Sequence, residues 1–112
     1  MSKQQVLIIG YVWVEPNSSA AGSRMMQLIE QFLIKNYKVT FASPAQKSDK
    51  ASSLNSLGID EVFIELNNAS FDEFIKELQP TLVMFDRFMM EEQFGWRVAE
   101  NCPNAIRILD TE

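Results

Sequence analysis

An uninterrupted apolar run at residues 6–9, made of valine, leucine and two isoleucines, constrains the fold of this chain more than any other feature. A strand with one face in water alternates apolar and polar residues, whereas this run offers apolar side chains to both faces. It therefore predicts a strand that is buried on both sides. Gly10 ends the run, a loop rich in small residues follows, and an amphipathic helix comes next. A buried strand, a loop and a helix form the first part of a βαβ unit, from which parallel sheets are built.

The rest of the chain repeats this alternation. Apolar segments predict further strands at residues 39–42, 61–66, 81–85 and 105–109. Apolar residues at helical spacing predict a first helix that ends near residue 36, helices at 70–78 and about 90–101, and a short helix within 45–58. We therefore expect residues 1–112 to form one Rossmann-like, three-layer α/β domain. Its five-stranded parallel sheet should have the strand order 3-2-1-4-5.

Single residues predict how three of these helices begin or end. Asn36 follows the first helix and tolerates the left-handed conformation of a C-terminal cap. Gly58 would close the short helix in the same way. Ser70 and Glu73 have the spacing of a capping box, in which each side chain accepts a hydrogen bond from the other residue's backbone N–H. This spacing predicts Ser70 as the N-terminal cap of the helix at 70–78.

Composition and charge narrow the classes of function. At 112 residues the chain is long enough for one core, and 10 basic against 15 acidic residues give a net charge of −5. A negatively charged domain is a poor match for nucleic acid, so we expect no nucleic-acid partner. One cysteine, Cys102, and no histidine argue against a disulfide framework and against a histidine or multi-cysteine metal site. Cys102 is expected to be a buried apolar side chain, and no metal is expected.

The sequence also bears on location. Lys3 ahead of the apolar run has the order of a signal peptide, but the run is short and no small-residue cleavage site closes it. No stretch approaches the roughly 20 apolar residues that span a bilayer. We expect a cytoplasmic protein, and the sequence leaves peripheral contact with a membrane surface open.

The strand order predicts where a ligand binds. In open parallel sheets, ligands bind outside the carboxyl ends of the strands where the order reverses, here between the first and fourth strands. That geometry would place the loop at 11–24 beside the segment at 86–90. Small residues before the first helix leave its free N–H groups open to an anion, and Arg24 adds a positive charge. The candidate residues for binding a phosphate or another part of a ligand are Asn17, Ser18, Ser19, Ala21, Gly22, Ser23, Arg24, Arg87 and Asp110. Asp86 is the candidate catalytic residue, because a carboxylate there could orient a ligand hydroxyl or act as a base.

Each candidate also has a purely structural interpretation. A serine of the loop could cap the helix, Arg24 could pair with Glu15, and Asp86 could form an ion pair with Arg87. Tyr11 and Trp13 could stack on a sugar, although aromatic residues in such loops more often pack beneath them.

The motifs of several common nucleotide and phosphate sites are missing, which weakens a dinucleotide site and excludes a P-loop. A dinucleotide dehydrogenase needs G-x-G-x-x-G after the first strand, but Gly10 is followed by no second glycine until Gly22. The second strand ends in Ser43-Pro44, without the acid that would hold a ribose. The sequence has no G-K-[ST] of a P-loop and lacks the acids of a response regulator at the ends of its first and third strands.

Three segments together resemble the N-terminal domain of GT-B glycosyltransferases of the family 4 type. They are the first strand with residues 16–24 (PNSSAAGSR), residues 37–44 (YKVTFASP) and the loop at Asp86. Those domains typically open with a strand, a proline-containing loop with Gly-Gly or Gly-x-x-Arg, and a helix. The resemblance covers essentially the whole chain, with one departure: Ala21-Gly22 stands where the family has a glycine doublet.

The resemblance implies an enzyme of the hexosyltransferase type that moves a sugar from a nucleotide-sugar donor to an acceptor. This half would bind the acceptor and reach the donor diphosphate through the Gly22 loop. The nucleotide-sugar is a substrate, and no cofactor is implied. A C-terminal donor-binding domain would supply nucleotide recognition and a pair of glutamates. Residues 1–112 are then expected to be the truncated N-terminal half of a two-domain enzyme.

Two other functions stay open at this point. The chain could be a stand-alone flavodoxin-like module that binds a nucleotide or phosphate without chemistry. It could instead be a protein-interaction module in which the exposed edge of the last strand docks a partner or forms a homodimer.

Overall fold

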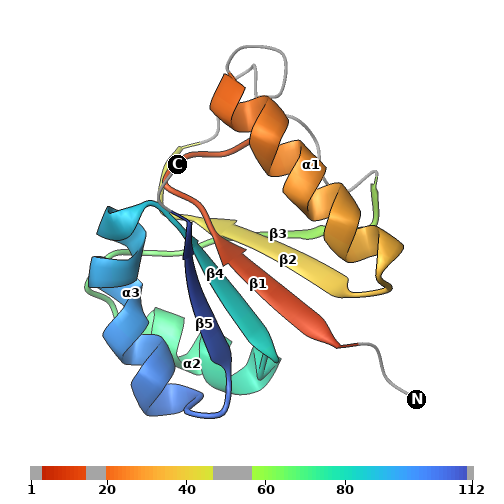
Figure 1. Cartoon of the computed structure of the whole chain (residues 1–112). Helices are drawn as coiled ribbons and strands as arrows, with labels where there is room; N and C mark the ends of the chain where they lie inside the picture. Colours follow the sequence, from red (N-terminus) through yellow and green to blue (C-terminus); the bar gives the residue numbers. More distant parts are fainter. Residues whose placement is uncertain (1–3, 15–19, 47–56, 111–112) are drawn as a thin grey trace.

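The computed structural model describes residues 4–14, 20–46 and 57–110 of the chain. Its elements are, in order, β1 (Gln5–Ile9), α1 (Ala20–Ile34), β2 (Lys38–Ser43), β3 (Asp60–Phe63), α2 (Ser70–Leu78), β4 (Leu82–Asp86), α3 (Phe88–Asn101) and β5 (Ile106–Asp110). The five strands form one parallel sheet in the order β3-β2-β1-β4-β5, which confirms the predicted fold class (Figure 1). The short helix expected within 45–58 falls mainly on residues outside the described ranges.

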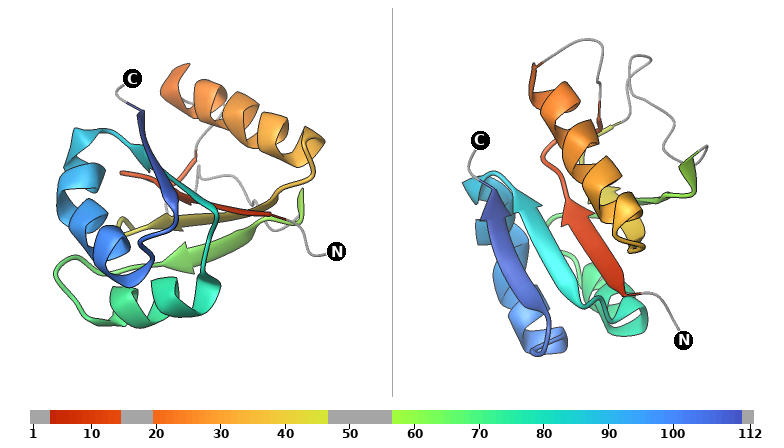
Figure 2. Two further views of the ribbon diagram at one scale, coloured as in Figure 1. Left: turned by 60° about the horizontal axis from the view of Figure 1, so that its bottom comes forward. Right: turned by 45° about the vertical axis from the view of Figure 1, so that its right-hand side comes forward.

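The sheet is the middle of three layers. Helix α1 covers one face of the sheet, while α2 and α3 cover the other (Figure 2). Residues of β1 alternate between the two cores: Val6 and Ile8 pack on the side of α1, and Leu7 and Ile9 pack on the side of α2 and α3. None of these four side chains is exposed. The apolar run is continuous because both faces of β1 are buried.

Of the three predicted helix ends, the one at Asn36 is confirmed and the one at Ser70 is wrong, while the helix that Gly58 would close lies mainly outside the described residues. Asn36 has a φ of 68° just after α1, as expected for a left-handed cap. Ser70 is the first residue of α2 rather than its cap, and the N-cap position belongs to Ala69, which makes no side-chain hydrogen bond. The capping box therefore does not form. Instead, the side-chain Oδ1 of Asn68 accepts a hydrogen bond of 2.8 Å from the Ser70 N–H.

The third strand is shorter than the sequence predicted. It ends at Phe63, whereas the apolar pattern extends to Leu66. The pattern continues because Ile64 is also buried, and its N–H still donates to the Ser43 carbonyl at 3.1 Å. A turn at Asn67, with a φ of 53°, then leads toward α2.

A polar link joins α2 to α3. The Asp72 carboxylate accepts hydrogen bonds from Arg97 Nη1 at 2.8 Å and from Asn101 Nδ2 at 3.0 Å. The Arg97 side chain is only 11% exposed, so its charge depends on this partner.

Replacing Asp72 with alanine should therefore destabilise the protein by about 2 kcal/mol, because the charge of Arg97 would stay largely buried without its carboxylate. Urea denaturation of both proteins measures the change. Asp60→Ala is the matched control, since Asp60 is exposed and its contact with Lys38 is 3.6 Å long; this variant should change stability by less than about 0.5 kcal/mol. Equal effects of the two variants would show that the link does not stabilise the helix pair.

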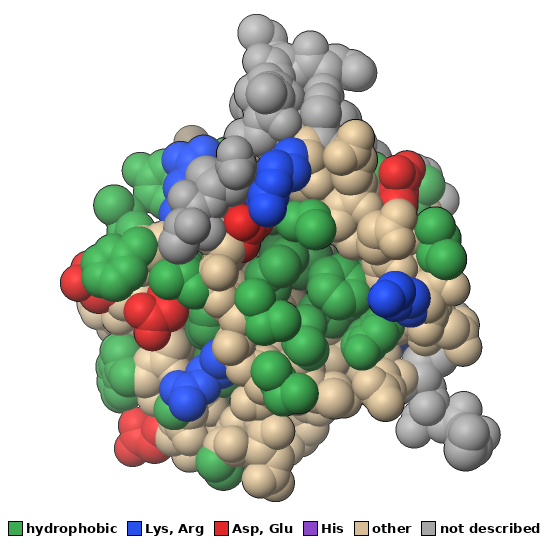
Figure 3. Space-filling model, in the orientation of Figure 1, with side chains coloured by type: hydrophobic (Ala, Val, Ile, Leu, Met, Phe, Trp, Pro, Cys, Tyr) green, Lys and Arg blue, Asp and Glu red, His purple; other side chains and the backbone are tan. Residues whose placement is uncertain are grey.

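Helix α1 does not cover the whole of its face. Apolar side chains gather at the centre of this face, beside α1 and over β4 (Figure 3). In β5 the side chains of Ile106 and Ile108 are 59% and 39% exposed, although a parallel strand of this composition is usually buried. Within the described ranges, no helix is both long enough and apolar enough to cross a membrane.

Candidate functional site

The carboxyl ends of β1 and β4 meet where the strand order reverses. These strands are hydrogen-bonded neighbours, with Ile9 opposite Phe85, and the loop that starts at Gly10 leaves β1 at this edge. Helix α1 also begins at this edge (Figures 1 and 2). Asp86 and Asp110 lie side by side, because they are in register at the ends of β4 and β5. The predicted site residues that the structure describes are thus brought together by the fold.

Arg24 and Asp110 form an ion pair that the sequence did not predict. Arg24 Nη1 lies 2.6 Å from Asp110 Oδ2, although the residues are 86 positions apart. The Asp110 side chain is 9% exposed and the Arg24 side chain is 41% exposed. The sequence predicts each residue as a separate contact to a ligand, not as a partner of the other. In this arrangement an incoming anion would compete with the Asp110 carboxylate for Arg24.

Asp86 is a partly buried carboxyl group with a raised pKa. Burial raises the pKa of Asp86 above its ordinary value of 3.8, and the neighbouring Asp110 raises it further. The charges of Arg87 and Arg24 and a hydrogen bond from the Tyr11 backbone act in the opposite direction without cancelling the effect. A carboxylate that holds a proton more readily than usual is better matched to proton transfer at neutral pH.

Arg87 holds an unusual backbone conformation between β4 and α3. Its φ of 79° and ψ of 150° lie in a region that suits glycine, and such a conformation costs roughly 1–3 kcal/mol for other residues. Its N–H donates to the Asp110 carbonyl at 2.7 Å. Its guanidinium carbon lies 5.0 Å from the centre of the Tyr11 ring. Within the described part of the chain, Arg87 has no carboxylate at ion-pair distance, so the expected Asp86–Arg87 ion pair is not formed.

The small-residue loop is only partly described. Asn17, Ser18 and Ser19 lie outside the described residues. The backbone of Ala21, Gly22 and Ser23 belongs to the first turns of α1, and their side chains lie outside the description. An anion site at this loop stays a prediction. What the structure adds is that Arg24, one turn into α1, faces the end of β5.

The two aromatic residues after β1 differ in role. Trp13 is buried, its Nε1 donates to the Ala45 carbonyl at 2.6 Å, and its ring packs against Phe41 with 5.8 Å between centres. The prediction that these residues pack beneath the loop is confirmed for Trp13. Tyr11 is 36% exposed and lies under the guanidinium of Arg87.

A mainly apolar pocket of about 370 Å³ lies at the same edge of the sheet, and the sequence did not reveal it. The loops that follow β1, β2 and β3 and the start of α3 together form its wall. Its lining residues are Tyr11, Val12, Pro44, Ala45, Leu66, Met89, Met90 and Gln93. We name it the strand-end pocket. The available signal was the presence of apolar residues such as Val12 and Leu66 in loops where polar residues are usual.

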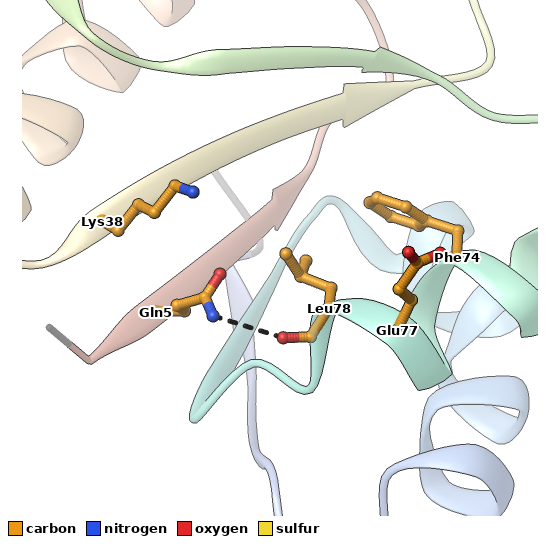
Figure 4. Close-up of a pocket in the computed structure, with 5 residues that line it drawn as sticks. All are labelled: Gln5, Lys38, Phe74, Glu77 and Leu78. Atoms are coloured by element: carbon orange, nitrogen blue, oxygen red, sulfur yellow. Dashed lines mark hydrogen bonds between the residues drawn. The ribbon is translucent and has the colours of Figure 1, made fainter. Parts of the chain in front are cut away.

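A second pocket, of about 330 Å³, lies at the opposite edge of the sheet (Figure 4). Lys38 from β2 and Glu77 from α2 stand on opposite sides of it, and Gln5 Nε2 donates to the Leu78 carbonyl at 3.3 Å. In this fold class, ligands bind at the carboxyl ends of the strands. We therefore place the candidate site at the edge that carries Asp86.

Cysteine and metal chemistry find little support in the part of the chain that the structure describes. Cys102 is buried, as predicted, and burial raises the pKa of its thiol. A buried thiol that resists deprotonation is a weak nucleophile. Among residues 4–14, 20–46 and 57–110, no three carboxylate, cysteine or histidine side chains are grouped to hold a metal ion.

The raised pKa of Asp86 predicts how its replacement affects stability. Because the folded-state pKa lies above the unfolded value, ionised Asp86 lowers stability at neutral pH. Asp86→Asn should therefore be more stable than the wild type at pH 7. The difference should shrink as the pH falls through the folded-state pKa and vanish below about pH 3.8, where Asp86 is protonated in both states. Thermal denaturation of both proteins between pH 3 and pH 7 measures this; a constant difference would contradict it.

In comparisons with known proteins, no protein-family model matches this chain and no curated protein sequence matches it.

Proposed function

We propose that this chain is the acceptor-binding half of a GT-B-type glycosyltransferase that moves a sugar from a nucleotide-sugar donor to an acceptor. The observation that supports the proposal most directly is the position of Asp86. This carboxyl group has a raised pKa, and it lies at the point where the strand order reverses, beside the Arg24–Asp110 pair at the start of α1. The resemblance of residues 16–24, 37–44 and the Asp86 loop to the family 4 type supports the same function.

In this proposal Asp86 is the general base. The acceptor hydroxyl would lose its proton to the Asp86 carboxylate as its oxygen bonds to the anomeric carbon of the sugar. The bond from that carbon to the nucleoside diphosphate would break, and the diphosphate would leave with the bonding electrons. Arg24, at the start of α1, would attract the diphosphate by exchanging its Asp110 partner for a phosphate oxygen. A donor-binding half, in the same polypeptide or in a partner, would hold the nucleotide.

The test is sugar transfer by the protein that includes a donor-binding half, measured as release of nucleoside diphosphate. Asp86→Asn should lower kcat by about 100-fold or more, because the amide cannot accept the proton. Asp60→Asn is the matched control, since Asp60 begins β3 at the opposite edge of the sheet and is exposed; it should leave the rate unchanged. Full activity of Asp86→Asn, or no transfer from any nucleotide-sugar in the presence of the other half, would contradict the proposal.

The β5 strand favours a second function, protein–protein interaction. It is an edge strand of the sheet, and Ile106, Ile108 and Leu109 are each at least 39% exposed. An exposed apolar edge strand is a surface for pairing with another chain. If a second copy binds there, sedimentation should show a dimer that Ile108→Lys dissociates. A monomer at all concentrations would exclude self-association through β5.

A further inference from the structure

We propose that the strand-end pocket binds the alkyl chain of an anionic amphiphile whose head group meets Arg87. The inference deepens the proposed function, on which its biological meaning rests, by naming the chemical class of the acceptor. The binding itself can be measured without sugar transfer.

The wall of the pocket gives the first argument. Val12, Leu66 and Met89 are 46%, 47% and 49% exposed, and they come from three segments that are far apart in the sequence. Single exposed apolar side chains are common on protein surfaces, but several around one cavity indicate a surface that an apolar ligand covers. The cavity of about 370 Å³ lies in the usual range for small-molecule sites. Methionine side chains such as Met89 adapt easily to flexible apolar ligands.

The charge at the rim gives the second argument. The Tyr11 ring is part of the pocket wall and also the surface on which the Arg87 guanidinium stacks. Among the described residues, Arg87 has no carboxylate at ion-pair distance. A cation without an acidic partner at the rim of an apolar pocket complements a ligand that is apolar at one end and anionic at the other.

The position of the pocket connects it to the candidate catalytic residue. The Tyr11 backbone hydrogen-bonds to Asp86, so one residue contacts the pocket, Arg87 and the carboxylate. A ligand whose chain fills the pocket would have its polar end near Asp86. This is where an acceptor hydroxyl is needed in the proposed function.

The volume sets an expected chain length. If a methylene group occupies roughly 30 Å³, similar to a water molecule in the liquid, a pocket of about 370 Å³ holds a single chain of up to about twelve carbons. Each added methylene should raise the affinity about fourfold until the pocket is full. Beyond that length the affinity should stop rising.

Methionine methyl NMR of the 112-residue chain is a direct test, with butyl, hexyl, octyl and dodecyl phosphate as probes below their micelle concentrations. The Met89 and Met90 methyl signals should shift, because both residues line the pocket. Met25 and Met84 are internal controls, since they are buried on the α1 side of the sheet, and their signals should not move. From butyl to hexyl phosphate the affinity should increase about 15-fold.

Variants separate the roles of the wall and the charge. Met89→Glu places a carboxylate in the wall and should weaken octyl phosphate at least tenfold; an acid in the first turn of α3 is compatible with the helix dipole. Phe88→Glu is the matched control, since Phe88 precedes Met89 in the same turn, is 60% exposed and does not line the pocket. Arg87→Gly suits the positive φ at this position. It should weaken octyl phosphate about tenfold and leave the neutral octyl glucoside unchanged.

Three results would overturn the proposal. The first is inorganic phosphate binding as tightly as octyl phosphate. The second is a shift of all methionine signals together, and the third is binding that occurs only with phospholipid vesicles. The proposed function can fail separately. If alkyl phosphates bind but no sugar transfer is found, the assignment of the pocket stands and the glycosyltransferase proposal is contradicted. Conversely, sugar transfer to water-soluble acceptors, with no shift of the Met89 signal when alkyl phosphates are added, would support the glycosyltransferase and contradict the assignment of the pocket.

Discussion

Replacing Phe94 with alanine should destabilise the protein by about 3–5 kcal/mol, the largest effect we expect from a single substitution. Phe94 lies in α3, has no exposed surface, and its ring centre is 4.8 Å from that of Phe71 in α2. The two rings join both helices to the same core as Leu7 and Val83 of the sheet. Alanine would remove this contact and leave a cavity that the packed helices cannot easily close.

Phe88→Ala is the control for this prediction, because it makes the same chemical change in the same helix. Phe88 is 60% exposed, so its loss should change stability by less than about 0.5 kcal/mol. Guanidinium denaturation of the three proteins measures both effects. A cost below about 1 kcal/mol for Phe94→Ala would show that α3 does not pack on the sheet as described.

Gly10→Val should destabilise the protein by about 3 kcal/mol through a clash at the end of β1. A Cβ atom at Gly10 would overlap the ring of Phe41 and would lie 3.1 Å from the Val12 carbonyl oxygen. Phe41 cannot move aside easily, because it is 1% exposed and packs against Trp13. The clash would also displace the loop that carries Tyr11 to the candidate site.

A second substitution tests this cause. Phe41→Leu replaces the ring with a smaller side chain, so the double variant should be more stable than the sum of the two single changes predicts, with a coupling of about 1 kcal/mol or more. Gly95→Ala is the control, since its added Cβ would meet only the end of the flexible Glu91 side chain within α3. Alanine favours helix, so this variant should be neutral or slightly stabilising. Strict additivity of Gly10→Val and Phe41→Leu would contradict the clash.

Much of the fold could be predicted because it depends on patterns along the sequence. The continuous apolar run in β1 required burial on both faces, and both cores contain its residues. The alternation of strands and helices predicted a parallel sheet, and its Rossmann-like interpretation gave the strand order that the structure has. The capping box failed because α2 begins at Ser70, so this serine is the first helical residue and not the cap, and the Asn68 side chain accepts the hydrogen bond from the Ser70 N–H instead.

The candidate site was predicted only in its location. The strand order placed Arg24, Asp86 and Asp110 at one edge, but the Arg24–Asp110 pair depends on the exact end of β5 and on the rotation of α1. The strained backbone of Arg87 and the strand-end pocket were not foreseen, since both arise where separate segments meet in space. The pattern of residues along one segment does not show which distant segments it will contact in the folded protein.

If an anion binds Arg24, the Arg24–Asp110 ion pair would couple that binding to local opening of β5. Asp110 ends an edge strand, and Arg24 ties that end to the first helix of the chain. An anion that draws Arg24 away would remove one of the restraints on the end of β5, which would then open more often. By thermodynamic linkage, a partner that binds β5 and holds it closed would weaken binding of the anion by the same factor by which the anion weakens binding of that partner. The end of β5 and the first turns of α1 would thus be thermodynamically coupled through this pair of charges.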